Sequence, residues 1–433
     1  MHHKFAKFFE INQYNTTWRA EIIAGITTFF AVAYVIIVNP LLLQSAGLDY
    51  SAALVATIVI SFCTSIAMGL FAGIPMAIAP GFGLCVFFTY TLVLKQGLSW
   101  NSALTASFFS GILLIILNVL KLRQKIILSI PTTLLKAITG ALGLYLIVIA
   151  LRLLGLVSIH EQSHITFNPM MNKEIGLTIV GFILIKTLLK KGITSAFIIV
   201  IVLNYILALC MGVTEYKGIV ALPPSLSPNL LKLDFQNIFN FTFLKGFYSI
   251  FLVTLFESSA GLITLGRILY PSGYIPRIQK ALVPDSVGTV IGSLLGTAPM
   301  SIRVESAAGI SIGGKTGIVS FVVGILFIGC LFFYPLTSSI PQSASAPILL
   351  VLGITMIRQL KDLNWKKGTD VIAVLATLII MPLYFSIYYG FAFGFISYVL
   401  VKSFTRERKQ IPIVCWVMAA LSVVQLFFEW LNR

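Results

Sequence analysis

The chain has 433 residues, of which 58% are hydrophobic and only 10% are charged, and its mean hydropathy is +0.99. A soluble protein carries roughly a quarter charged residues, so this composition excludes a soluble globular enzyme and indicates an all-α polytopic membrane protein. The formal net charge is +16. Because the cations stand in short groups between apolar runs, their expected partner is the lipid bilayer and not nucleic acid.

The apolar runs predict fourteen membrane-spanning segments. In chain order they cover residues 21–43, 52–71, 76–95, 102–120, 134–156, 174–189, 193–212, 247–266, 282–296, 299–314, 317–338, 344–357, 369–387 and 389–403. From the fourth segment onward the even-numbered connections are basic, which predicts a cytosolic N-terminus in the cell membrane, with the bacterial inner membrane as the expected location. The polar first 20 residues indicate no cleaved signal peptide. A last apolar segment, 412–430, fits an interfacial helix as well as a fifteenth span.

The third and tenth segments are unsuited to a continuous helix. Residues 74–83 contain two prolines and two glycines, and residues 296–305 are short and polar and begin with a glycine. Backbone of this kind at membrane depth is extended or unwound and lines a cavity or lies buried in protein. Each half of the chain has one such segment, followed later by an Ile-Pro at 130–131 or 340–341. We therefore expect two inverted seven-span repeats with a transport site at their broken helices.

Two acidic residues are expected deep inside the membrane, Glu257 and Glu305. The other acids lie in predicted loops or near predicted segment ends, including Glu21 and Asp285. A mid-membrane charge is costly, about 2.5–3.5 kcal/mol on insertion scales, so such residues usually face a cavity and act on a ligand or proton. Arg303 alternates with Glu305 in extended backbone, and it either neutralises an acid or binds an anionic substrate.

Catalytic and metal-binding patterns are not expected. The five cysteines have no CxxC spacing, and His160 and His164 lie in a polar loop, so we expect neither disulfides nor a metal site. The spans contain no HExxH or GxSxG motif, so we expect a protein that is not an enzyme and has no cofactor, apart from a coupling ion, H⁺.

Several runs resemble the nucleobase–cation symporter-2 superfamily, the xanthine/uracil permease-like proteins. The likeness covers about residues 17–404 and is closest to the azaguanine-type branch of adenine, guanine and hypoxanthine permeases. It is carried by AEIIAGITTFFAVAYVIIVNP, PGFGLCVFFTYT, FESSAGLITLGR, ESAAGISIGGKTG and MPLYFSIYYGFAFGFISYVL. The resemblance implies a secondary active transporter for a small molecule, with proton-coupled uptake of a purine or related nucleobase by alternating access. A homodimer is a possible assembly that the resemblance does not decide.

The resemblance also implies a division of the chain. It implies a core domain over 21–120 and 247–338 and a gate domain over 121–246 and 339–404. From the sequence itself we expect a cytosolic N-terminal segment over 1–20 and a C-terminal hydrophobic helix over 405–433. Glu257 and Glu305 match the acids of spans 8 and 10, which implies substrate binding and proton coupling. The substrate-binding residues implied or expected beside them are Arg303, Cys85, Gly83, Phe87 and Ser306.

Three residues differ from the usual pattern of this branch. Glu257 replaces an Asp, Cys85 replaces an Asn and Arg303 replaces a Tyr. A thiol is a far weaker hydrogen-bond partner than an amide, so the departures favour a different or more acidic ligand than the common purines. The competing interpretation is an anion transporter or exchanger of the same architecture, because Arg303 stands next to a predicted helix start.

Overall fold

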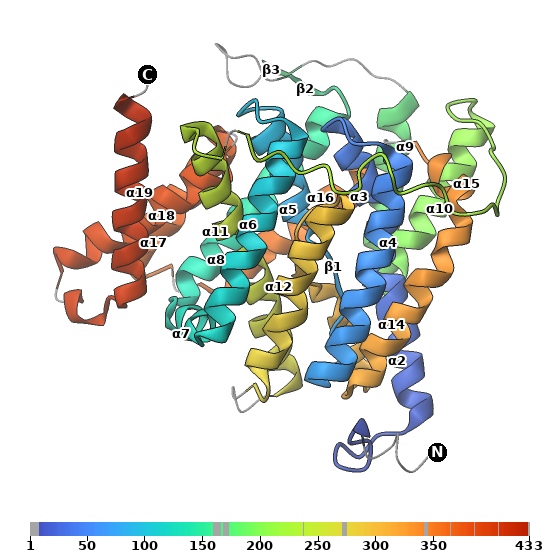
Figure 1. Ribbon diagram of the computed structural model, residues 1–433, viewed down its shortest axis with the longest axis horizontal. Coiled ribbons are helices and arrows are strands. Elements are labelled where there is room, and N and C mark those ends of the chain that lie inside the picture. The colour runs from blue at the N-terminus through green and yellow to red at the C-terminus, as the bar shows by residue number, and fades with distance from the viewer. Residues whose placement is uncertain are drawn as a thin grey trace. The chain divides into compact units, whose positions relative to one another are not determined.

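The computed structural model describes residues 8–158, 166–167, 173–236, 238–270, 275–341, 345–363, 365–384, 386–405 and 407–431 (Figure 1). The two histidines singled out above lie outside these ranges. The chain forms two compact units: unit 1 consists of Met1–Lys121 and Ile179–Ser345, and unit 2 of Leu122–Thr178 and Ala346–Arg433. Helix α9 (Lys173–Lys190) is divided between them.

The first part of unit 1 is helical up to an extended segment. Its elements are α2 (Trp18–Val32), α3 (Val35–Ser45), α4 (Tyr50–Ala67), η1 (Met68–Ala72), β1 (Ile78–Pro80), α5 (Phe82–Val86), η2 (Phe87–Val93) and α6 (Trp100–Val119). Thr17, Asp49 and Ser99 each accept a hydrogen bond from the backbone N–H three residues further on, which satisfies a free N–H at the start of α2, α4 and α6.

The second part of unit 1 has the same order of long helices followed by a strand. Its elements are α10 (Ala196–Cys210), α11 (Phe241–Leu269), α12 (Ile278–Leu295), β4 (Met300–Ile302), η3 (Val304–Ser306), α13 (Ala307–Ser311), α14 (Gly317–Gly329), η4 (Cys330–Phe333) and α15 (Tyr334–Ser338). The buried Glu21 of α2 accepts the backbone N–H groups of Lys315 and Thr316, so a side chain from the first half fixes the residues just before α14.

Strands β1 and β4 pair antiparallel in the middle of unit 1, with Ile78 opposite Ile302 and Pro80 opposite Met300. The extended backbone predicted in the third and tenth segments is therefore confirmed. β1 packs against α4 (Figure 1), and β4 packs against α11 and α12. A Cβ at Gly261 would collide with the carbonyl oxygen of Ile302, so only glycine lets α11 approach β4 this closely.

Unit 2 is a bundle of packed helices that includes the C-terminal helix. Its elements are α7 (Leu122–Ser129), α8 (Thr132–Leu153), β2 (Val157–Ser158), β3 (Thr166–Phe167), α16 (Ala346–Arg358), η6 (Gln359–Asp362), α17 (Gly368–Leu383), α18 (Ile387–Ser403), η7 (Arg408–Gln410) and α19 (Ile413–Leu431). β2 and β3 form a short antiparallel pair. A Cβ at Gly143 of α8 would lie 2.5 Å from the carbonyl oxygen of Gly353 of α16, so small residues allow these helices to touch.

Within the described ranges, six helical segments are long and apolar enough to cross a membrane: Trp18–Ser45, Tyr50–Ala72, Trp100–Val119, Thr132–Leu153, Phe241–Leu269 and Gly317–Ser338. Shorter apolar helices cover Phe82–Val93, Ala196–Cys210, Gly368–Leu383, Ile387–Ser403 and Ile413–Val424. This set identifies a multi-pass membrane protein. The count of fourteen spans and the inverted repeat stay predictions.

One expectation about the acids was wrong. Helix α12 begins at Ile278, four residues before the predicted segment, so Asp285 lies two turns inside the helix and is fully buried. The helix extends back beyond the predicted start at residue 282, and the proline at position 284 lies inside it. Glu21 is also fully buried, and it accepts hydrogen bonds from the backbone N–H and the hydroxyl of Thr316.

Candidate functional site

Glu257 lies in the middle of α11 and faces the start of α5. The backbone N–H groups of Gly83 and Leu84 hydrogen-bond its carboxylate. A Cβ added at Gly83 would lie 2.5 Å from Glu257 Oε2, and one at Gly81 would lie 2.7 Å from Oε1. The glycines that follow β1 therefore make room for a carboxylate that projects from another helix. The free N–H groups at the beginning of α5 suit that negative charge.

Arg303 leaves β4 and is buried, with 5% of its side chain exposed. Its Nη2 lies 2.8 Å from Glu305 Oε1 and donates to the Tyr34 hydroxyl at 2.5 Å. The Tyr34 hydroxyl donates in turn to Glu305 Oε1 at 2.5 Å, and Nη1 donates to the carbonyl oxygen of Pro80 at 3.2 Å. Arg303, Glu305 and Tyr34 thus form a closed triangle of charge-assisted hydrogen bonds.

Three buried polar atoms at this site have no hydrogen-bond partner among the described residues: Glu257 Oε2, Glu305 Oε2 and Arg303 Nε. An unsatisfied buried polar group costs about 1–3 kcal/mol, and more when it is charged, so native proteins keep few of them without a reason. The three atoms offer two acceptors and one donor. The arrangement can therefore bind a small polar ligand that supplies N–H donors and an acceptor in return.

The other residues expected at the site are buried, and they differ in what they contact. Ser306 is buried and its hydroxyl accepts the backbone N–H of Ala77, so it fixes the extended backbone before β1. The Cys85 thiol is buried and donates to the backbone carbonyl of Asn39, at 3.7 Å, on α3. Phe87 is fully buried at the start of η2. The structure thus brings Gly83 to Glu257 and Arg303 to Glu305, and it engages Ser306 and Cys85 with backbone groups.

Tyr34 was not expected at the site. It lies at the break between α2 and α3, where the predicted first span was continuous, and its side chain is fully buried. Its ring packs against Phe197 of α10, with centroids 5.3 Å apart. The one signal in the sequence is a hydroxyl-bearing residue inside the apolar run AVAYVII. This signal is weak, because tyrosines are common in membrane helices.

Metal ligands are not grouped in the part of the chain that the structure describes: no cluster of three or more His, Cys, Asp or Glu could hold an ion. All five cysteines are free. The site's chemistry is therefore that of carboxylates, a guanidinium, a phenol and backbone amides.

Comparison with known proteins shows that the chain is similar to permeases. The family model described as a permease family matches residues 19–393. Adenine permease AdeP of Escherichia coli (strain K12) is 34% identical over 425 residues, which cover 98% of this chain and 96% of AdeP. Guanine/hypoxanthine permease PbuO of Bacillus subtilis (strain 168) is 32% identical over 430 residues, which cover 97% of this chain and 99% of PbuO.

Among solved structures, the fold is similar to the transmembrane domain of the cyanobacterium bicarbonate transporter BicA. The TM-score is 0.65 at 16% sequence identity, and the match covers 86% of this chain and 96% of that domain. At this identity the likeness shows a shared membrane-transporter fold.

Proposed function

The chain belongs to the permease family, and we propose that it is a proton-coupled secondary active transporter of a neutral purine nucleobase. Its relatives named above are permeases for adenine or for guanine and hypoxanthine. The observation that carries the proposal is the Glu257 carboxylate, which faces backbone amides at the start of α5 and whose buried Oε2 has no partner among the described residues. This oxygen can accept an N–H from the base or bind the coupled proton.

The pairing of Arg303 supports a neutral substrate. Its guanidinium is held by Glu305 and Tyr34 at 2.8 and 2.5 Å, so its charge is compensated inside the protein. An anionic ligand that bound the guanidinium through Nη2 would have to break this pair, and breaking a buried ion pair costs about 3–5 kcal/mol. The alternative of an anion transporter draws on the shared BicA fold and is disfavoured by this geometry. The pairing of Arg303 also disfavours the more acidic ligand that the sequence led us to expect.

The proposal includes the membrane topology. Fourteen spans in two inverted repeats, with the N-terminus in the cytosol of a cell membrane, would place Lys190, Arg277 and Lys366 on the cytosolic side and Ser99 and Ser339 outside. Alternating access would move core segments against gate segments. Single cysteines at these five positions, labelled from outside the cell, test the topology. Labelling at position 277 or 366 would contradict it. Cross-linking would check the homodimer, which stays a prediction.

The substrate is tested by uptake into a host without its own purine permeases. We expect saturable uptake of labelled adenine, guanine or hypoxanthine that rises with an inward proton gradient and stops with a protonophore. Bicarbonate and sulfate flux should stay at background. Glu257→Gln should abolish gradient-driven accumulation, whereas Glu215→Gln, on a connection between predicted spans, is the matched control and should transport normally. Anion flux without base uptake would overturn the proposal.

A further inference from the structure

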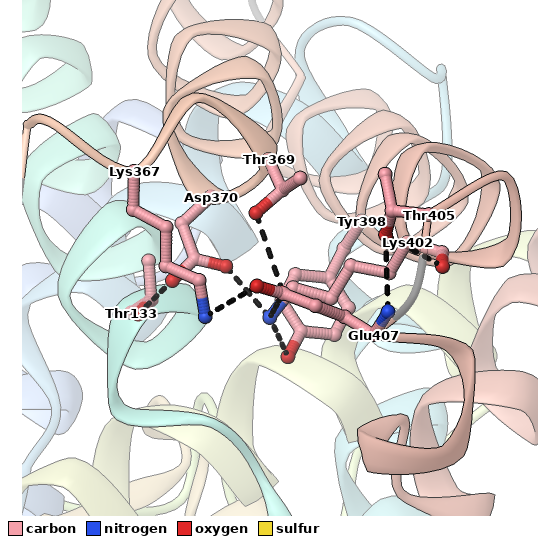
Figure 2. A network of polar contacts seen from close by, with 8 residues as sticks. All are labelled: Thr133, Lys367, Thr369, Asp370, Tyr398, Lys402, Thr405 and Glu407. Atoms are coloured by element: carbon pink, nitrogen blue, oxygen red, sulfur yellow. Dashed lines mark hydrogen bonds and ion pairs between the residues drawn. The ribbon is translucent and has the colours of Figure 1, made fainter.

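A second cluster of charges lies in unit 2, at the end of α18 (Figure 2). Lys402 is buried, with 4% of the residue exposed. Its Nζ lies 2.7 Å from Asp370 Oδ1 and 3.3 Å from Glu407 Oε2, and it donates to the Tyr398 hydroxyl at 3.0 Å. The ammonium also lies 4.4 Å from the centre of the Tyr398 ring. This lysine is fixed from several sides.

Glu407 joins the cluster to the connector 404–412, which links α18 to α19. Its Oε1 lies 3.0 Å from Lys367 Nζ, and its Oε2 is shared between Lys402 and the Thr369 hydroxyl, 3.4 Å away (Figure 2). One carboxylate thus bridges the start of α17 and the end of α18. The connector is held in place by charge pairs with Lys367 and with the buried Lys402.

Other side chains at the connector are exposed, and they are apolar or positively charged. Phe404 is 88% exposed and Ile413, which opens α19, is 74% exposed. Arg408 and Lys409 are exposed as well. Glu407 is the one acid in the sequence of the connector, against three cations. Because Glu407 is paired inward with Lys367 and Lys402, the connector presents surplus positive charge next to exposed apolar side chains.

We propose that the connector 404–412 is a binding site for an anionic phospholipid, and that the Glu407 pairs hold it in the binding position. The connector follows a membrane helix, where exposed aromatic and apolar side chains lie at the level of the headgroups. Arg408 and Lys409 supply donors for a headgroup phosphate, and Phe404 and Ile413 contact the acyl chains. Charge complementarity selects an anionic over a zwitterionic lipid.

The test titrates the purified full-length protein in detergent with phosphatidylglycerol, and with phosphatidylcholine as the neutral probe, and counts bound lipid by native mass spectrometry. The double variant Arg408→Gln/Lys409→Gln should lose roughly five-fold in phosphatidylglycerol affinity for each cation, about 25-fold in all, with phosphatidylcholine binding unchanged. The matched control is Lys190→Gln/Lys191→Gln, which removes two adjacent exposed cations at the end of α9. Unchanged phosphatidylglycerol binding in the first variant, or an equal loss in the control, overturns the proposal.

A third variant separates positioning from charge. Glu407→Ala removes a negative charge, so a purely electrostatic attraction would become stronger. We expect weaker phosphatidylglycerol binding, because the connector loses its anchor on Lys367 and Lys402. Tighter binding by Glu407→Ala would overturn the positioning role. The lipid measurement needs no transported substrate, so its outcome does not depend on the function proposed for unit 1.

Discussion

Replacing Gly83 with alanine tests the geometry around Glu257. The new Cβ would lie 2.5 Å from Glu257 Oε2 and 3.3 Å from Cδ, whereas ordinary van der Waals contacts begin near 3.4 Å. The carboxylate must therefore move by about 1 Å, and its hydrogen bonds with the start of α5 must change. A displacement of ~1 Å in a site of this kind can cost about 100-fold in rate. Alanine is also a good helix former, so α5 itself should not be weakened.

We expect Gly83→Ala to lower the initial rate of purine uptake by about two orders of magnitude at a normal level of folded protein. The assay is uptake of labelled hypoxanthine or adenine in cells, normalised to the amount of protein that elutes as a single species in detergent. Gly329→Ala is the matched control, because a Cβ there meets no atom within 4 Å. Uptake by Gly83→Ala at the wild-type rate would refute the assignment of Glu257 to the transport site.

Three further outcomes follow from the contacts. Glu257→Gln should lose accumulation driven by a proton gradient yet keep base exchange, measured by counterflow in liposomes; loss of both would argue against a proton role. Arg303→Gln should cost about 3–5 kcal/mol of unfolding free energy, and adding Glu305→Gln should restore most of it, measured by chemical denaturation. The Gln236 backbone N–H and the Ser102 hydroxyl lower the pKa of Asp234, so its stabilising effect holds above the ordinary carboxyl pKa and disappears as pH falls through the lowered value. Ser102→Ala should raise hydrogen exchange at residues 231–236 near neutral pH, and equal exchange in both proteins would contradict this.

The extended part of the site could be predicted because its cause is local. Proline and glycine in residues 74–83 and 296–305 forbid a continuous helix, and the structure has β1 and β4 in these segments. Glu257 could likewise be singled out, because an acid in a long apolar run has few structural explanations. Such signals need only a short window of sequence.

The partners within the site could not be predicted, because they come from segments far apart in the chain. Tyr34 bonds Glu305 across 271 positions, and extended backbone alone left open whether Arg303 would pair with Glu257, Glu305 or a ligand. The choice depends on how α2, α3 and β4 pack, which no local pattern encodes. Asp285 shows the same limit: α12 begins four residues before the predicted segment, so this acid lies inside the helix and is buried.

The charges at the site connect these observations to the substrate. With Glu257 and Glu305 ionised, the three side chains including Arg303 carry a formal charge of −1. One proton and a neutral base together bring the loaded site to zero, which lowers the cost of carrying it through the low-dielectric interior. An anionic base would return the loaded site to −1 after the same proton, and a second proton would be needed. The internal pairing of Arg303 thus favours a neutral base with one proton, and measuring one proton taken up per base would support that balance.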